Sequence, residues 1–170
     1  HRVLCCVVGA CGTRVYIPFR GCELEVRHLK PMFDLGQLGL MPFSPRDEGS
    51  IEDSICNSDV VINMIGKHYE TKHIVPTRRE DGNLCRINYS FEETHVEIPR
   101  RIARLAKKNG VKTFIHVSAL AADLESSSKW SQSKARGELA VREEFPEAII
   151  VKAGTVFGPE DRFLNWIAEV

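Results

Sequence analysis

The chain has 170 residues, of which 43% are apolar and 27% are charged, values that are ordinary for one globular domain. Its 23 Lys and Arg residues balance 23 Asp and Glu residues, so no charge imbalance points to nucleic acid or to an anionic membrane. No apolar run approaches the roughly 20 residues that a membrane-spanning helix needs. Composition therefore gives no sign of a nucleic-acid-binding or membrane-spanning protein.

Six cysteines raise the question of disulfides or a metal site, but no C-x-x-C pair occurs. Cys5 and Cys6 are neighbours in an apolar run that reads as a strand, where they would point to opposite faces. We expect free, mostly buried thiols in a reducing compartment, and no metal ion.

Short β-branched runs alternate with helical patterns along the chain. This order is typical of a Rossmann-like, doubly wound α/β fold with a mainly parallel sheet. The predicted strands are, in chain order, Val3–Val8, Arg14–Phe19, Leu38–Phe43, Asp59–Ile65, Thr113–Ser118 and Ala148–Lys152.

The first predicted strand ends in glycines, as expected of a loop that holds a pyrophosphate at the start of a helix. Gly9, Ala10 and Gly12 are the candidates for this role. However, Arg14–Phe19 follows as a second strand, and a parallel crossover needs a dozen or more residues. Either the two strands form an antiparallel hairpin with the glycines in its turn, or the first crossover helix is missing.

Arg20 follows the second predicted strand, the place at which dinucleotide-binding folds distinguish NAD from NADP. An arginine there suits the 2′-phosphate of NADPH, whereas an acidic residue would bind the ribose hydroxyl. The alternative for Arg20 is a solvated side chain at a strand end.

A short helix is predicted to start near Ser50, with Asp53 in its first turn. The segment His73–Ile87 is polar and lacks periodicity, which indicates an exposed loop excursion.

The next helix is predicted from its ends. Ser90 and Glu93 form a capping-box pattern, and Gly110 is placed to close the helix. Pro99 is expected to kink or restart it. A further helix is expected over Ser128–Glu144.

The order of motifs resembles the short-chain dehydrogenase/reductase superfamily in its extended or atypical branch. The fourth strand ends in an Asn/Gly segment, the fifth ends in a serine, and a lysine follows in a motif similar to Tyr-x-x-x-Lys. The resemblance implies that a cofactor contacts Asn63, Ile65, Gly66, Ser118 and Lys134. Taken alone, Ser118 also reads as a strand-end serine and Lys134 as a solvated helix lysine.

A longer series of segments resembles a narrower family, the NADPH-binding accessory subunits of mitochondrial complex I (NADH:ubiquinone oxidoreductase). The matching segments are Val15–Arg20, Gly36–Leu38, Arg46–Asp47, Asn63–Gly66, Tyr69–Lys72, Phe114–Ser118, Phe145–Val151 and Glu160–Asn165. The resemblance implies a nucleotide-binding domain over residues 1–170, NADPH as a structural cofactor and other complex I subunits as partners. It also implies a place on the matrix side of the inner membrane, peripheral and without a membrane span.

The chain departs from that family's pattern in three places. We expect the first crossover helix to be missing, residues 73–87 to be inserted, and the C-terminal region to be truncated. The resemblance also places Asp47 near the adenine, although a helix-capping role fits it nearly as well.

The catalytic tyrosine of the superfamily motif is replaced by Trp130. Indole donates a hydrogen bond but supplies no ionisable phenol, so a general acid is lost. His116 is expected to be a core histidine, because no second ligand lies at metal spacing. Three hypotheses remain: a non-catalytic NADPH-binding accessory subunit, an NADPH-dependent reductase or epimerase with an unusual acid, and an interaction module that has lost nucleotide binding.

Overall fold

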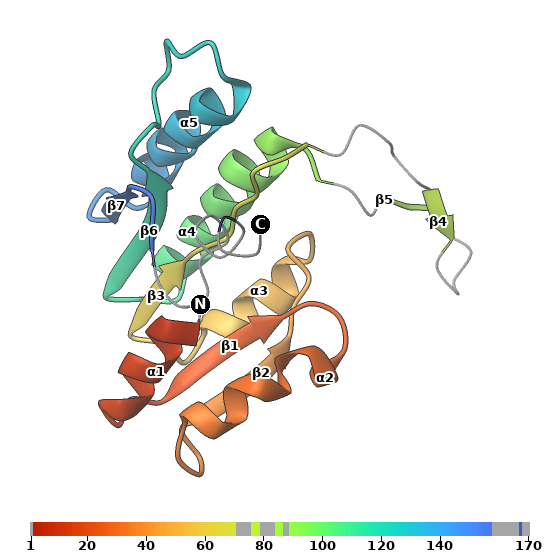
Figure 1. The fold of residues 1–170 in the computed structure, drawn as a ribbon, viewed down its shortest axis with the longest axis vertical. Helices are drawn as coiled ribbons and strands as arrows, with labels where there is room; N and C mark the ends of the chain where they lie inside the picture. The colour runs from red at the N-terminus through yellow and green to blue at the C-terminus, as the bar shows by residue number, and fades with distance from the viewer. Residues whose placement is uncertain (1, 71–75, 79–83, 87–88, 158–166, 168–170) are drawn as a thin grey trace.

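The computed structural model of the chain describes residues 2–70, 76–78, 84–86, 89–157 and 167. It confirms the α/β fold class, with parallel strands connected by helices (Figure 1). The elements are α1 (Arg2–Ala10), β1 (Val15–Phe19), α2 (Glu23–Val26), η1 (Arg27–Met32), β2 (Leu38–Pro42), α3 (Glu48–Ile55), β3 (Val60–Asn63), β4 (Pro76–Arg78), β5 (Leu84–Arg86), η2 (Glu93–Glu97), α4 (Ile98–Lys108), β6 (Thr113–Ala119), α5 (Lys129–Glu144) and β7 (Ile149–Ala153).

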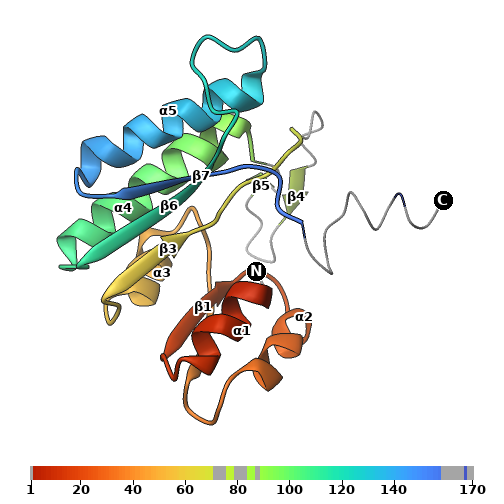
Figure 2. The same cartoon turned by 60° about the vertical axis from the view of Figure 1, so that its left-hand side comes forward.

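All the predicted strands after the first are confirmed, and they form two parallel sheets. β1 pairs with β2, while β6 lies between β3 and β7 in the second sheet. In both views β3 is the strand of the second sheet nearest to β1 (Figures 1 and 2). Within the described residues β1 and β3 each pair with a strand on one side only, so the sheet is split between them.

The prediction of a strand over Val3–Val8 is wrong, because these residues lie in helix α1. A short apolar run fits a buried strand and a helix equally well. Gly9 lies within α1, where a Cβ atom would come 2.5 Å from the Met32 carbonyl oxygen, so glycine allows α1 to pack closely on η1. Gly12 has φ +74° in the turn between α1 and β1.

The two alternatives for the start of the chain are both corrected by this helix. β1 pairs in parallel with β2, so Arg14–Phe19 is not the second arm of an N-terminal hairpin. The second alternative assumed a strand directly before Arg14–Phe19, and a helix stands there instead.

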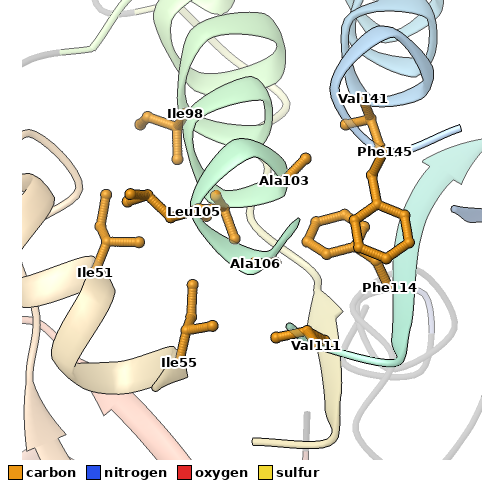
Figure 3. Packing of buried hydrophobic residues seen from close by; sticks show 11 residues of the cluster. Ile51, Ile55, Ile98, Ala103, Leu105, Ala106, Val111, Phe114, Val141 and Phe145 are labelled. Carbon is orange, nitrogen blue, oxygen red and sulfur yellow. The ribbon is translucent and has the colours of Figure 1, made fainter. Parts of the chain in front are cut away.

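Helices α4 and α5 cover one face of the second sheet, and α3 packs beside α4 (Figure 3). Phe114 of β6 is fully buried, and its ring stacks on Phe145 with 5.8 Å between the ring centroids. Ile51 of α3 and Ile98 of α4 belong to the same core cluster. The core therefore lies between this sheet and its helices.

The opposite face of the second sheet carries apolar side chains that are not covered by the described residues. They are between 41% and 50% exposed, and they are Val60 and Ile62 of β3 and Ile149 and Val151 of β7.

The helix predicted between Ser90 and Gly110 is confirmed. The Ser90 hydroxyl accepts the Glu93 N–H at 3.1 Å, which is half of the predicted capping box. Pro99 has no N–H to bond the His95 carbonyl, and the preceding turn widens into the π-turn η2. Gly137 of α5 packs directly against that carbonyl, where a Cβ atom would collide with the His95 oxygen.

The other two predicted helices are present, one with a different start. α5 begins after Ser128, as expected. α3 begins at Glu48, and Asp53 lies in its second half, so the prediction that Asp53 is in the first turn is wrong. Asp47 caps α3, because its carboxylate accepts the Gly49 N–H at 3.1 Å.

The excursion His73–Ile87 is only partly described. The described part contains the antiparallel pair β4 and β5, so it is not entirely loop as predicted. The remainder of the excursion lies outside the described residues.

Four cysteines have described side chains, of which Cys11, Cys22 and Cys56 are free thiols. Cys11, Cys22 and Cys56 are exposed and Cys5 is half-buried, so the expectation of mostly buried thiols is wrong. Among the described helices, none is both long and apolar enough to cross a membrane.

Replacing Gly137 by alanine is expected to destabilise the domain by about 1–3 kcal/mol, because the new methyl group overpacks the crossing of α5 and η2. Urea denaturation measures the change in the free energy of unfolding. The matched control is Gly49→Ala in α3, where the nearest atom would lie 3.5 Å away and stability should be unchanged or slightly raised. Equal effects of the two substitutions would contradict the close crossing.

Candidate functional site

The predicted site residues of β3 and β6 meet at the carboxyl ends of these parallel strands, where open α/β sheets bind their ligands. Asn63 and His116 are register partners, and the Asn63 amide donates to His116 Nδ1 at 3.1 Å. The Asn63 side-chain oxygen accepts the Ile65 N–H at 3.1 Å. Asn63 is 3% exposed, so this buried amide fixes the start of the loop after β3.

The next part of that loop is held by its peptide groups. The Lys67 N–H donates to His95 Nε2 at 3.2 Å, and the Lys67 carbonyl accepts the Trp130 indole N–H at 2.9 Å. The Lys67 ammonium donates to the Tyr89 carbonyl. The loop after β3 is thus attached to both the π-turn η2 and helix α5.

The hydrogen bonds around His95 assign its protonation. The Ser133 hydroxyl donates to the Trp130 carbonyl at 2.7 Å, so the ring donates from Nδ1 to Ser133 Oγ at 2.8 Å. Nε2 is then free to accept the Lys67 N–H. Burial, followed by the positive charge of Lys134, lowers the pKa of His95 to about 4. His95 is therefore neutral near pH 7.

Trp130 lies one helical turn before Lys134 on α5. Its ring stacks on His68 with 5.6 Å between centroids and meets His95 edge to face at 6.5 Å. The indole N–H, the only donor of the side chain, donates to the Lys67 carbonyl oxygen. Trp130 therefore joins α5 to the loop and offers no proton to a ligand.

Lys134 is 8% exposed, and burial lowers the pKa of its ammonium while the Glu138 carboxylate opposes that shift. Its Nζ lies 2.9 Å from where a Cβ atom on Gly66 would be. Within the described residues Lys134 makes no hydrogen bond or ion pair, and buried His116 Nε2 has no partner either. Among the described residues, His116 Nε2 is thus the fully buried side-chain nitrogen of the site that lacks an acceptor.

Ser118 is buried at the carboxyl end of β6, and its hydroxyl donates to Glu138 Oε1 at 2.5 Å. Glu138 Oε2 pairs with Lys152 of β7 at 3.0 Å. Neither Glu138 nor His95 is among the site residues predicted from the sequence. The signal for Glu138 is its position four residues after Lys134, which places both on one helix face.

The other predicted residues lie apart from this constellation. Arg20 follows β1, and its guanidinium lies 5.3 Å from the centroid of the Tyr89 ring. Arg46 lies over the same ring at 4.2 Å and forms a two-point ion pair with Glu93. Asp47 caps α3, which confirms the alternative weighed for it.

Gly9 and Ala10 lie in α1 and Gly12 in the turn that leads to the amino end of β1. They lie within or directly after a helix and not at the end of a strand, so the reason for assigning a pyrophosphate to them is removed. Among the described residues, no group of His, Cys, Asp or Glu could hold a metal ion.

A fall in pH from about 6.5 to 4 is expected to weaken the fold, because His95 and His116 both have a pKa of about 4 in the folded chain. In the unfolded chain they bind protons near pH 6.5, so the unfolded state is favoured within this window, by up to about 1.4 kcal/mol per pH unit for each ring. Urea midpoints measured across the window test this. His95→Gln or His116→Gln should flatten the slope, while the surface control His28→Gln should not; an unchanged slope in both core variants would contradict it.

No protein-family model matches the sequence. Curated proteins match over nearly the whole chain. It is 45% identical over 161 residues to "NADH dehydrogenase [ubiquinone] 1 alpha subcomplex subunit 9, mitochondrial" of Mus musculus, covering 95% of this chain and 39% of that protein. It is 43% identical to the "NADH-ubiquinone oxidoreductase 40 kDa subunit, mitochondrial" of Neurospora crassa, covering 94% and 38%. The chain thus spans about two fifths of the length of these relatives.

Solved structures share the fold at low sequence identity. Serine dehydrogenase from Escherichia coli has a TM-score of 0.63 at 15% identity and covers 100% of this chain and 87% of that chain. A dTDP-glucose 4,6-dehydratase double mutant from Streptomyces venezuelae, solved with NAD bound, has a TM-score of 0.59 at 17% identity, covering 99% and 57%. The resemblance that the sequence motifs predicted is confirmed by the curated matches, and the solved structures confirm the fold.

Proposed function

This chain is a homologue of the alpha subcomplex subunit 9 of mitochondrial NADH dehydrogenase, and we propose that it is a nucleotide-binding, non-catalytic part of such an accessory subunit. In this proposal NADPH is a structural cofactor, and the subunit supports assembly and stability of complex I on the matrix side of the inner membrane. Its partners are other complex I subunits.

The position of Lys134 is the observation that carries the nucleotide proposal. The residue is 8% exposed and its ammonium has no protein acceptor among the described residues, so the hydroxyl oxygens of a ribose would supply one. Gly66 lets the loop pass close to this ammonium, because a Cβ atom there would lie 2.9 Å from Nζ. The loop after β3 is already held by Asn63, His95 and Trp130, so binding would require little ordering of the chain.

Arg20 supports NADPH over NADH. It is exposed after β1, where the superfamily resemblance places the 2′-phosphate, and its guanidinium rests against the Tyr89 ring. An arginine binds a phosphate through paired N–H donors. NADH has no 2′-phosphate and would not gain this interaction.

The absence of an acid at the tyrosine position supports the non-catalytic part of the proposal. A bound NADPH supplies hydride chemistry in reductases, yet turnover also needs a proton donor near the reacting carbonyl. Trp130 has no ionisable group, and its N–H is bonded to Lys67. The nucleotide would then act by binding to the folded state, which stabilises it by RT ln(1 + [L]/Kd).

The interaction module is the second candidate. It is favoured by the position of Gly9 and Gly12, which lie in and after a helix instead of at the end of a strand. In that case the fold would serve contacts alone. The reductase or epimerase has no comparable support, because no tyrosine occupies the motif.

The test measures nucleotide content and affinity. Gentle purification, denaturation and mass spectrometry should release about one NADPH per chain. Lys134→Met should weaken both NADPH and NADH about ten-fold or more in titration calorimetry, because one charge-assisted hydrogen bond is lost. Arg20→Ala should weaken the binding of NADPH but not that of NADH. Lys129→Met is the matched control for Lys134→Met, because Lys129 is an exposed lysine on the same helix.

Two results would overturn the proposal. A cooperatively folded chain that neither carries nor binds a dinucleotide would favour the interaction module. Steady oxidation of NADPH in the presence of a carbonyl substrate would restore the reductase hypothesis.

A further inference from the structure

A carboxylate that no sequence motif indicated lies at the centre of the site. Glu138 has 14% of its side chain exposed and bonds two register partners of the sheet, Ser118 on β6 and Lys152 on β7. One oxygen accepts the Ser118 hydroxyl at 2.5 Å, and the other accepts the Lys152 ammonium at 3.0 Å. Because both oxygens are engaged, the carboxylate is held in one orientation.

This arrangement fixes the direction of the hydrogen bond that Ser118 can offer. A serine hydroxyl carries one proton and two acceptor lone pairs. The proton is directed to Glu138, so toward any ligand Ser118 presents lone pairs only. A reductase would need the opposite polarity here, because a carbonyl oxygen must receive a proton donor.

We propose that Glu138 is a positioning residue that sets the polarity of Ser118, so that the site selects a ligand group with an N–H or O–H donor over a bare carbonyl oxygen. The selectivity rests on the proposed nucleotide site, whereas the direction of the Ser118 proton does not. A nicotinamide carboxamide offers such an N–H donor. Lys152 and Ser118 each donate to one of the two Glu138 oxygens.

Glu138→Gln is the informative variant, because glutamine keeps the shape of the side chain and replaces one acceptor oxygen by an NH2 group that donates. Lys152 requires an acceptor, so the glutamine oxygen should face Lys152 and its amide should donate to Ser118 Oγ. The Ser118 proton is then released toward the ligand. Glu143→Gln is the control, since Glu143 is also on α5 but 67% exposed at its side chain.

The binding readout compares NADPH with its 3-acetylpyridine analogue, which keeps the carbonyl but lacks the carboxamide N–H. The wild-type chain and Glu143→Gln should prefer NADPH by about ten-fold, the worth of one hydrogen bond. Glu138→Gln should lose or reverse that preference while keeping its thermal midpoint within a few degrees. Ser118→Ala should show no preference. The same preference in all four chains would overturn the selectivity.

A second readout needs no ligand. In NMR spectra the Ser118 hydroxyl proton of the wild-type chain should exchange slowly and resonate downfield, and this signal should vanish in Glu138→Gln and Ser118→Ala. Its absence from the wild-type chain would overturn the inference. If the signal is present but neither dinucleotide binds, the proposed nucleotide function fails and the selectivity with it, while the assigned polarity of Ser118 is supported.

Discussion

The hydrogen bond from the Trp130 indole to the Lys67 carbonyl is the contact on which the site depends, since it joins helix α5 to the loop after β3. His95 of the π-turn η2 accepts the N–H of the same residue. The backbone of Lys67 is therefore held on both of its sides, through two consecutive peptide groups, by η2 and α5. Trp130 thus has a structural role, since its indole joins α5 to the loop.

This clamp requires a close approach of two helices. Pro99 cannot bond the His95 carbonyl, the turn widens, and Gly137 lets α5 pack on the exposed oxygen. The approach brings Lys134 and Glu138, one turn apart, over the ends of β3 and β6. Lys134 faces the loop and Glu138 faces the strands, so one face of α5 carries both the cation of the site and the carboxylate that orients its serine.

Much of the fold and part of the site could be predicted from the sequence. Parallel strands such as Val60–Asn63 read as nearly continuous apolar runs, and Ser90 marked its helix start, because these signals are local. The run Val3–Val8 was misread since its length and composition fit either element, and only its packing on η1 decides. Ser118 and Lys134 were placed by motif order. Glu138 and His95 were missed because their roles arise from contacts between distant segments.

The split between β1 and β3 has a consequence for how this domain behaves among other chains. Each of these strands presents a row of backbone N–H and C=O groups that no described strand pairs. Apolar side chains flank one of these rows, at Val60 and Ile62. Such edges recruit extended segments through main-chain hydrogen bonds, with little regard for sequence. The purified domain should therefore self-associate more as its concentration rises. A segment that pairs with these two edges would suppress that association.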